Sequence, residues 1–194
     1  NAEDGGHRKF IMVQLPEVTD EKSEARKAGY ANICEIGKER IRRAGKKVKE
    51  EAGLQGQDLD IGFRVLKLDS SNMEDVYYTP DDLTEQTLFN SVDNVKPDRT
   101  PLDLLFQVLP ELNIELSARI EEKEVHGKKV FMVNGDQLIA TFDTDVNEST
   151  ITEIAKLRPI YFVMRDASAE NDNVLDNFEQ IFKHYSPDTI RRIL

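Results

Sequence analysis

The sequence contains very little cysteine and no long apolar run. One cysteine, Cys34, occurs in 194 residues, which excludes an internal disulfide and a zinc site built from several cysteines. No apolar run approaches the roughly 18 residues that a membrane-spanning helix requires, and residues 1–9 contain no signal-peptide core. These absences predict a soluble cytoplasmic protein without a membrane partner, in which Cys34 is a small buried hydrophobic residue.

The motifs of common enzyme classes are also missing. The chain has no glycine-rich phosphate loop with its lysine and no G-x-S-x-G sequence. Its three histidines, His7, His126 and His184, lie far apart and lack the spacing of metal ligands. We therefore expect neither a conventional hydrolase nor a metal site, and we predict no catalytic residue within this chain.

Charge is strongly acidic overall but unevenly distributed. The formal net charge is −11, from 26 Lys and Arg against 37 Asp and Glu, so the chain should be repelled by phosphate backbones in general. The segment Lys38–Lys49 nevertheless contains seven cations and one anion. Two interpretations stay open: the cations complement a helix dipole and an acidic surface, or they form a patch facing phosphates. The candidate DNA-binding residues on this segment are Arg42, Arg43, Lys46 and Lys47.

The first third of the sequence predicts a βαβ unit. Residues Phe10–Leu15 form a nearly continuous apolar run that is typical of a buried strand. Thr19 or Asp20 can cap a long helix from about Glu21 to Ala52, which carries an apolar stripe at three- and four-residue steps. The segment Ile61–Asp69 then predicts a second strand. Strand, helix and strand in this order imply parallel pairing and a right-handed crossover.

The remaining sequence predicts a second α/β region. Thr100 and Pro101 begin a helix, and two glycine-centred turns, His126–Gly127 and Asn134–Gly135, predict an antiparallel meander of three strands. A short helix ending at Pro159, a buried strand, a further helix and a closing edge strand follow. The predicted fold class is therefore α/β with a mixed sheet: a partial Rossmann-like sheet, then an α/β domain containing the meander.

Three side chains at the ends of the predicted parallel strands are candidate ligand-binding residues. Gln14 and Glu17 follow the first strand, and Asp69 follows the second. Open α/β sheets bind ligands at the carboxyl ends of their strands, where acidic or amide side chains accept hydrogen bonds from ribose hydroxyls. The alternative is that these side chains cap the next helix or solvate a loop, and spacing alone does not separate the two.

Several ordered strings carry a resemblance to a known family. They are "NAEDGG", "RKFI", "EIGKERIRRAGKKVKEE", "GFRVLKLDSSN", "DRTPLDLLFQVL", "IEEKEVHGKKVFMV" and "RPIYFVMRDASAENDNVLDNFEQIF". Together they resemble the C-terminal part of the modification subunit of type III restriction–modification systems, which are site-specific adenine-N6 DNA methyltransferases. The resemblance extends over essentially the whole chain.

The resemblance implies that this chain is one part of a longer enzyme whose catalytic motifs lie elsewhere. In that family the catalytic D-P-P-Y loop and the F-x-G-x-G cofactor loop precede this region, and neither sequence occurs here. The chain would then be an inactive fragment whose Gln14, Glu17 and Asp69 contribute to the S-adenosylmethionine site, with weak or absent binding on its own. Residues 1–75 would complete the methyltransferase core, 76–99 form an irregular connection, and 100–194 form an assembly domain. The implied partners are DNA, a restriction subunit and a second copy of the modification subunit.

Two other functions remain open at the level of sequence. The chain could serve chiefly as a dimerisation module or a docking module for the restriction subunit, without its own ligand. It could also be an α/β nucleotide-binding protein unrelated to methylation.

Overall fold

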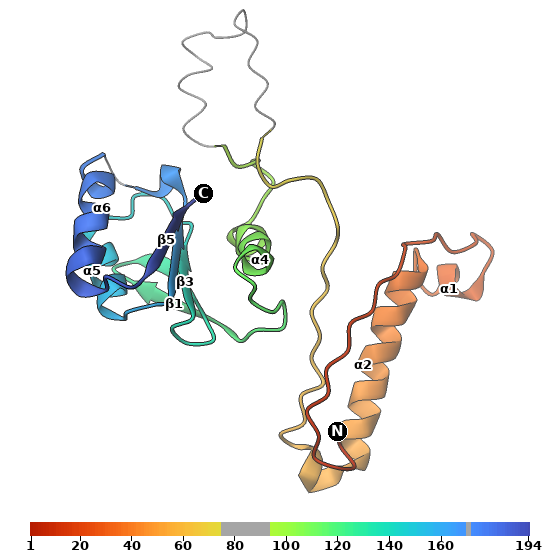
Figure 1. The fold of residues 1–194 in the computed structure, drawn as a ribbon. Helices are drawn as coiled ribbons and strands as arrows, with labels where there is room; N and C mark the ends of the chain where they lie inside the picture. The colour runs from red at the N-terminus through yellow and green to blue at the C-terminus, as the bar shows by residue number, and fades with distance from the viewer. Residues whose placement is uncertain (75–93, 170–171) are drawn as a thin grey trace, which may run out of the picture. The chain divides into compact units, whose positions relative to one another are not determined.

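The computed structural model describes residues 1–74, 94–169 and 172–194, and it divides into two compact units. The first unit is Asn1–Lys67 and the second is Leu68–Leu194 (Figure 1). The predicted irregular connection, residues 76–99, lies mostly outside the described residues. The two units differ in packing and are described separately below.

The second unit is built on one five-stranded mixed sheet. Its strands are β1 (Ile120–Val125), β2 (Lys128–Val133), β3 (Leu138–Thr141), β4 (Tyr161–Met164) and β5 (Ile190–Ile193), and they lie in the order β1-β2-β3-β4-β5. The first three strands pair antiparallel, whereas β3, β4 and β5 pair parallel. The predicted meander, buried strand and closing edge strand are confirmed, as is the mixed α/β fold class.

Helices cover both faces of this sheet. Helix α4 (Pro101–Glu111) packs on the face that carries Phe131, Leu138 and Val163, through Leu104, Leu105, Val108 and Leu109. Helices α5 (Glu148–Lys156) and α6 (Asp172–Tyr185) cover the opposite face, which carries Ile139 and Phe162. Figure 1 shows α4 on one side of the strands and α5 with α6 on the other. Consecutive residues of one strand, such as Leu138 and Ile139, therefore enter different cores.

Local sequence signals explain where these elements begin and turn. Thr100 caps α4, with Pro101 as its first residue, and Thr100 and Asp103 form a reciprocal capping box. Asn134 and Gly135 both adopt positive φ, 49° and 79°, in the tight turn between β2 and β3. Asn and Gly tolerate this left-handed conformation better than other residues. The two-residue hairpin turn is the one between β1 and β2, where His126 and Gly127 have φ of 50° and 77°.

The first unit contains a broken helix instead of the predicted continuous one. A short helix α1 (Glu24–Lys27) is capped by Ser23, and a separate helix α2 (Ile33–Glu51) is capped by Asn32. The prediction of one helix from about Glu21 to Ala52 is therefore wrong. Gly29 has a φ of 92° between the two helices, which is outside the helical region, and Asn32 then supplies a new N-cap.

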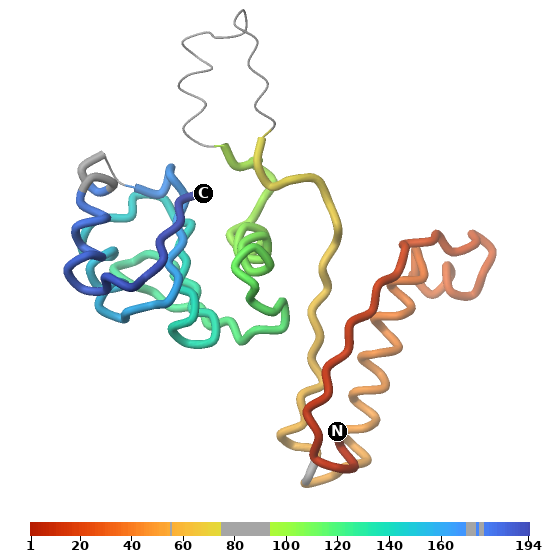
Figure 2. The backbone as a smooth tube through the Cα atoms, viewed as in Figure 1, coloured from red at the N-terminus to blue at the C-terminus, as the bar shows by residue number. Residues whose placement is uncertain are grey.

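The two strands predicted in the first unit are also not formed. Within residues 1–67, all described, a single bridge joins Val18 to Asn32, and no ladder includes Phe10–Leu15 or Ile61–Lys67. Both segments are instead extended chain along α2 (Figures 1 and 2). Cys34 Sγ lies 3.6 Å from the carbonyl oxygen of Gln14, and a Cβ added at Gly45 would lie 3.1 Å from Ile61 Cβ. A strand needs a second strand beside it, and within residues 1–67 neither segment forms a ladder with one.

Cys34 is half-buried and not fully buried. Its thiol contacts the backbone carbonyls of Gln14 and Leu15, and the first unit contains no buried apolar residue around it. The prediction that Cys34 is a buried hydrophobic residue is therefore wrong, because no buried apolar core surrounds it in the first unit.

Candidate functional site

Gln14 and Glu17 lie beside the first residues of α2. The backbone N–H of Ile33, the first residue of α2, donates to the carbonyl oxygen of Glu17 at 3.0 Å. The amide of Gln14 makes one local bond, from Nε2 to the carbonyl of Leu15 at 3.2 Å. Glu17 forms no ion pair with any described residue. Both side chains are exposed, so a carboxylate and an amide oxygen are available for hydrogen bonding near the positive end of a helix dipole.

Asp69 belongs to the second unit, where it contacts a cation distant in sequence. Its Oδ1 accepts the backbone N–H of Ser70 at 2.7 Å, and its Oδ2 lies 3.5 Å from Arg99 Nη1. The Ser70 N–H and, to a smaller extent, the charge of Arg99 hold the pKa of Asp69 below its usual range. The Asp69 side chain is still 67% exposed, so the carboxylate remains accessible to a hydroxyl donor.

A network of polar contacts holds the segment after Asp69 against α4. Arg99, whose side chain is only 11% exposed, donates from Nη2 to Ser70 Oγ at 3.0 Å. Lys96 Nζ donates to the same oxygen at 2.9 Å. Asn72 Nδ2 donates to Gln107 Oε1 at 2.7 Å and to the carbonyl of Asp103. These contacts fix the backbone around Asp69 in the second unit.

The sequence alone did not predict this network of contacts. Arg99 lies thirty residues beyond Asp69, and the spacing between them corresponds to no helical or strand repeat. The capping signal of Thr100 indicates a helix start, but it does not indicate what the preceding arginine contacts. Contacts of this kind are set by tertiary packing, so no local sequence pattern predicts them.

The four basic residues predicted to bind DNA all lie on α2. Arg43 Nε contacts Glu39 Oε1 at 2.6 Å, and this hydrogen bond raises the pKa of Arg43. Lys46 and Lys47 lie 3.8 Å and 3.7 Å from the carboxylates one turn further on, those of Glu50 and Glu51. These i,i+4 pairs are exposed and contribute little to stability.

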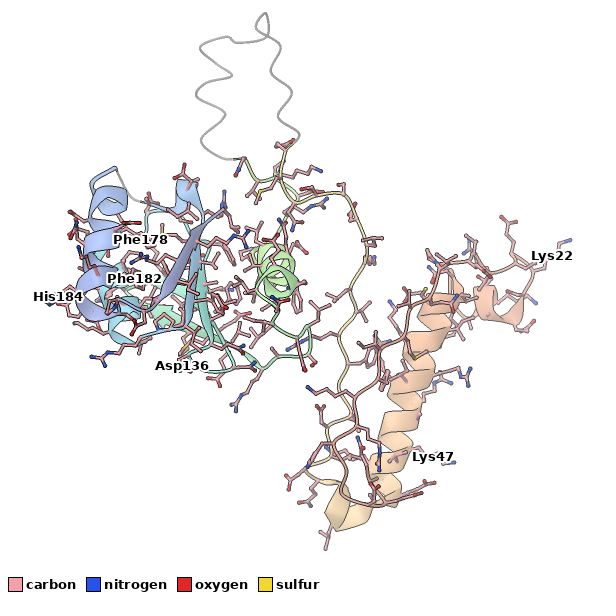
Figure 3. The ribbon with its side chains drawn as sticks, in the orientation of Figure 1. Lys22, Lys47, Asp136, Phe178, Phe182 and His184 are labelled. Carbon is pink, nitrogen blue, oxygen red and sulfur yellow. The ribbon has the colours of Figure 1, made fainter. Side chains whose placement is uncertain are left out.

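Arg42 differs from its neighbours on α2. Its guanidinium lies 5.6 Å from the ring centroid of Phe63 in the second extended segment, and it also approaches Glu39 at 3.8 Å. Arg42 is therefore partly used in holding the first unit together. Lys47 projects from α2 toward solvent, as does Lys22 near α1 (Figure 3).

The described residues offer no metal site. Among residues 1–74, 94–169 and 172–194, no three His, Cys, Asp or Glu side chains gather in a way that could hold a metal ion. In the same ranges, no helix has the length and apolarity needed to cross a membrane. The candidate chemistry is therefore hydrogen bonding by Gln14, Glu17 and Asp69, and charge on α2.

Comparison with known proteins gives one partial similarity to report. No protein-family model matches the chain. Over 64 residues the chain is 39% identical to the Type III restriction-modification enzyme StyLTI Mod subunit of Salmonella typhimurium, strain LT2. These residues make up 33% of this chain and 10% of that protein, so the chain matches only a small part of the curated relative. The similarity supports a relationship to type III modification subunits.

Proposed function

We propose that this chain is part of a site-specific DNA adenine-N6 methyltransferase, the modification subunit of a type III restriction–modification system. The 39% identity to the StyLTI Mod subunit is the observation that carries the proposal. The order of the sequence strings agrees with it. Because D-P-P-Y and F-x-G-x-G are absent, the chain alone is inactive and acts as one portion of a cytoplasmic enzyme.

Within that enzyme, Gln14, Glu17 and Asp69 contribute to binding S-adenosylmethionine. When bound, this cofactor supplies the methyl group for adenine N6. The exposed carboxylates of Glu17 and Asp69 and the amide oxygen of Gln14 are acceptors that suit ribose hydroxyls. The Ser70 N–H and, to a smaller extent, the charge of Arg99 lower the pKa of Asp69, so its carboxylate stays a hydrogen-bond acceptor down to lower pH.

Methyl transfer from labelled S-adenosylmethionine to DNA tests this proposal. The 194-residue chain should show no transfer, and the intact modification subunit should be active. Replacing Glu17 by Gln and Asp69 by Asn in the intact enzyme should raise KM for S-adenosylmethionine more than it lowers kcat, because these groups bind the cofactor's ribose and not the reacting atoms. Robust activity of the chain alone would contradict the proposal.

The basic face of α2 contributes to DNA binding in the intact enzyme. Reversing the charges of Arg42, Arg43, Lys46 and Lys47 should weaken DNA binding and reduce the dependence of log Kd on log salt. Reversing Lys22 and Lys27, which are exposed cations outside α2, is the matched control and should leave the salt slope unchanged. An unchanged slope of log Kd against log salt in the α2 variant would show that these residues have a purely structural role.

A second candidate function is assembly. The second unit is a closed α/β domain in which β5 forms an edge of the sheet with Ile190 and Ile193 exposed. An exposed edge strand is a surface through which another chain can pair. A homodimer or a complex with the restriction subunit would be detected by sedimentation at micromolar concentration. A monomer that binds neither partner would exclude this function.

A third candidate, an α/β nucleotide-binding protein unrelated to methylation, is favoured by no contact in the described residues. Calorimetry with other nucleotides distinguishes it, because the methyltransferase proposal expects none of them to bind tightly.

A further inference from the structure

The cations of α2 lie on two opposite sides of the helix. An α-helix turns by about 100° per residue, and this rotation divides most of the cations of α2 into two groups around its axis. The inner cations, which fall within about 20° of one direction, are Lys38, Arg42 and Lys49. The outer cations, which fall within about 60° of the opposite direction, are Arg40, Arg43 and Lys47.

The inner side of α2 faces the extended segments of the first unit. Cys34 and Gly45 lie on this side of the helix, and both lie close to these segments. The guanidinium of Arg42 lies 5.6 Å from the ring centroid of Phe63. The side chain of Lys38 is only 21% exposed. The inner side is therefore occupied by other parts of the first unit.

The outer side of α2 faces away from these segments, as Figure 3 shows for Lys47. Arg40, Arg43 and Lys47 are all exposed, and the side chains of the last two are 74% and 75% exposed. Ala44 lies among them and is also exposed. Because its side chain is short, the three cations project furthest from this side of the helix. They are accessible to a large anionic partner.

Arg40 differs from the other two outer cations in its contacts. Within the part of the chain that the structure describes, Arg40 forms no hydrogen bond or ion pair. Arg43 and Lys47 contact carboxylates of the same helix at 2.6 Å and 3.7 Å, but exposed pairs of this kind are weak, so a phosphate can replace the carboxylate. The guanidinium of Arg40 presents five N–H donors in a planar fork that suits a phosphate. Arg40 is not one of the four residues predicted from the sequence to bind DNA.

We infer that the outer side of α2 binds the phosphate backbone of double-stranded DNA through Arg40, Arg43 and Lys47. The inference rests on the proposed function, which supplies DNA as the ligand, and it assigns the contact to one side of the helix and to a further residue. The outer cations span about 10 Å along the helix axis. Over that length of duplex, one DNA strand carries about three phosphates. When the helix lies along the duplex, each outer cation can therefore approach a different phosphate.

The outer side suits phosphates better than base edges or a lipid surface. Reading a base edge requires a free bidentate donor, whereas Arg43 and Lys47 share their N–H groups with carboxylates. A helix that lies in a membrane interface carries large apolar side chains opposite its polar face, and the residue among the outer cations is Ala44. A contact made with phosphates alone is independent of base sequence. The outer side should therefore strengthen binding to all DNA equally.

Fluorescence anisotropy with the intact modification subunit tests the inference. The probes are a duplex that the subunit methylates and a duplex of unrelated sequence. The double variant Arg40→Gln, Lys47→Gln should reduce the slope of log Kd against log salt by about 1.8 on both duplexes. Arg40→Gln alone should reduce this slope by about 0.9, whereas Arg40→Lys, which keeps the charge, should retain it.

The matched control is the double variant Lys38→Gln, Lys49→Gln. It removes the same amount of charge from the same helix, but from the inner side, and it should leave the slope of log Kd against log salt unchanged. Wild-type subunit with vesicles of phosphatidylserine and phosphatidylcholine provides the comparison with a lipid surface. It should bind these vesicles more weakly than either duplex.

Five results would overturn the inference. They are the absence of DNA binding by the intact subunit, an unchanged salt slope in the outer double variant, an equal reduction in the inner double variant, a loss of affinity confined to the methylated duplex, and tighter binding to the vesicles than to DNA. Methyl transfer is measured separately. Methyl transfer with an unchanged slope would remove the inference and keep the proposed function. A reduced slope in a subunit that transfers no methyl group would do the reverse.

Discussion

At the scale of single residues, Asp69 gives the most direct test of a contact distant in sequence. The Ser70 N–H and the Arg99 charge lower the pKa of Asp69 from its ordinary value of 3.8. Replacing Arg99 by Met should therefore raise the pKa of Asp69, although the Ser70 N–H will keep it somewhat lowered. A pH titration of the Asp69 carboxyl carbon by NMR measures this directly.

The same substitution should change how stability depends on pH. A carboxyl group whose pKa is lowered in the folded state stabilises that state above its unfolded pKa, and this contribution is lost as pH falls through the folded pKa. Arg99→Met should therefore flatten the fall in unfolding free energy below about pH 4. Asp98→Asn, which leaves Arg99 in place, is the control and should not raise the pKa of Asp69.

At the scale of elements, the capping box of α4 is the clearest local interaction that stabilises a helix start. Thr100 Oγ1 accepts the N–H of Asp103 at 3.3 Å, and Asp103 Oδ2 accepts the Thr100 N–H at 2.7 Å. Thr100→Ala should lower the unfolding free energy by about 1 kcal/mol, measured by urea denaturation. Thr144→Ala is the matched control, because Thr144 is exposed and, among the described residues, its side chain hydrogen-bonds only to Asp145. Equal losses in the two variants would contradict the capping role.

The packing of α6 on the sheet gives a larger expected effect. Phe182 is fully buried, and its ring lies 5.1 Å from that of Phe162 and 5.2 Å from that of Phe178. Figure 3 shows Phe178 and Phe182 directed toward the sheet and His184 directed away from it. Phe182→Ala should cost about 3–5 kcal/mol, whereas Ile190→Ala, on the exposed edge, should cost less than about 1 kcal/mol. Urea denaturation of both variants compares them.

The elements predicted correctly are those with strong local signals. Thr100–Pro101 and Asn134–Gly135 fix the start of α4 and the β2–β3 turn through their own backbone preferences. The helix predicted over 21–52 failed because its apolar stripe begins only at Tyr30, whereas Gly29 and Asn32 locally end one helix and begin another. The strands predicted at 10–15 and 61–69 have the correct extended backbone, but pairing depends on a neighbour that no local pattern specifies. Asp69 is an accessible carboxylate, and its role in cofactor binding stays a prediction, whereas its contact with Arg99 was not predictable from the sequence.

At the scale of the whole molecule, the two units should differ sharply in their ability to fold alone. All buried apolar side chains of the described residues belong to the second unit, and hydrophobic burial is the main favourable term in folding. A polypeptide of residues 68–194 should therefore unfold cooperatively, with a Tm within about 4 °C of that of the full chain. Calorimetry and circular dichroism on both polypeptides provide the measurement. Residues 1–67 alone should show no cooperative transition, because α2 has no closed core to pack against. A cooperative transition in residues 1–67, or failure of residues 68–194 to fold, would show that the stability of the chain is not concentrated in the second unit.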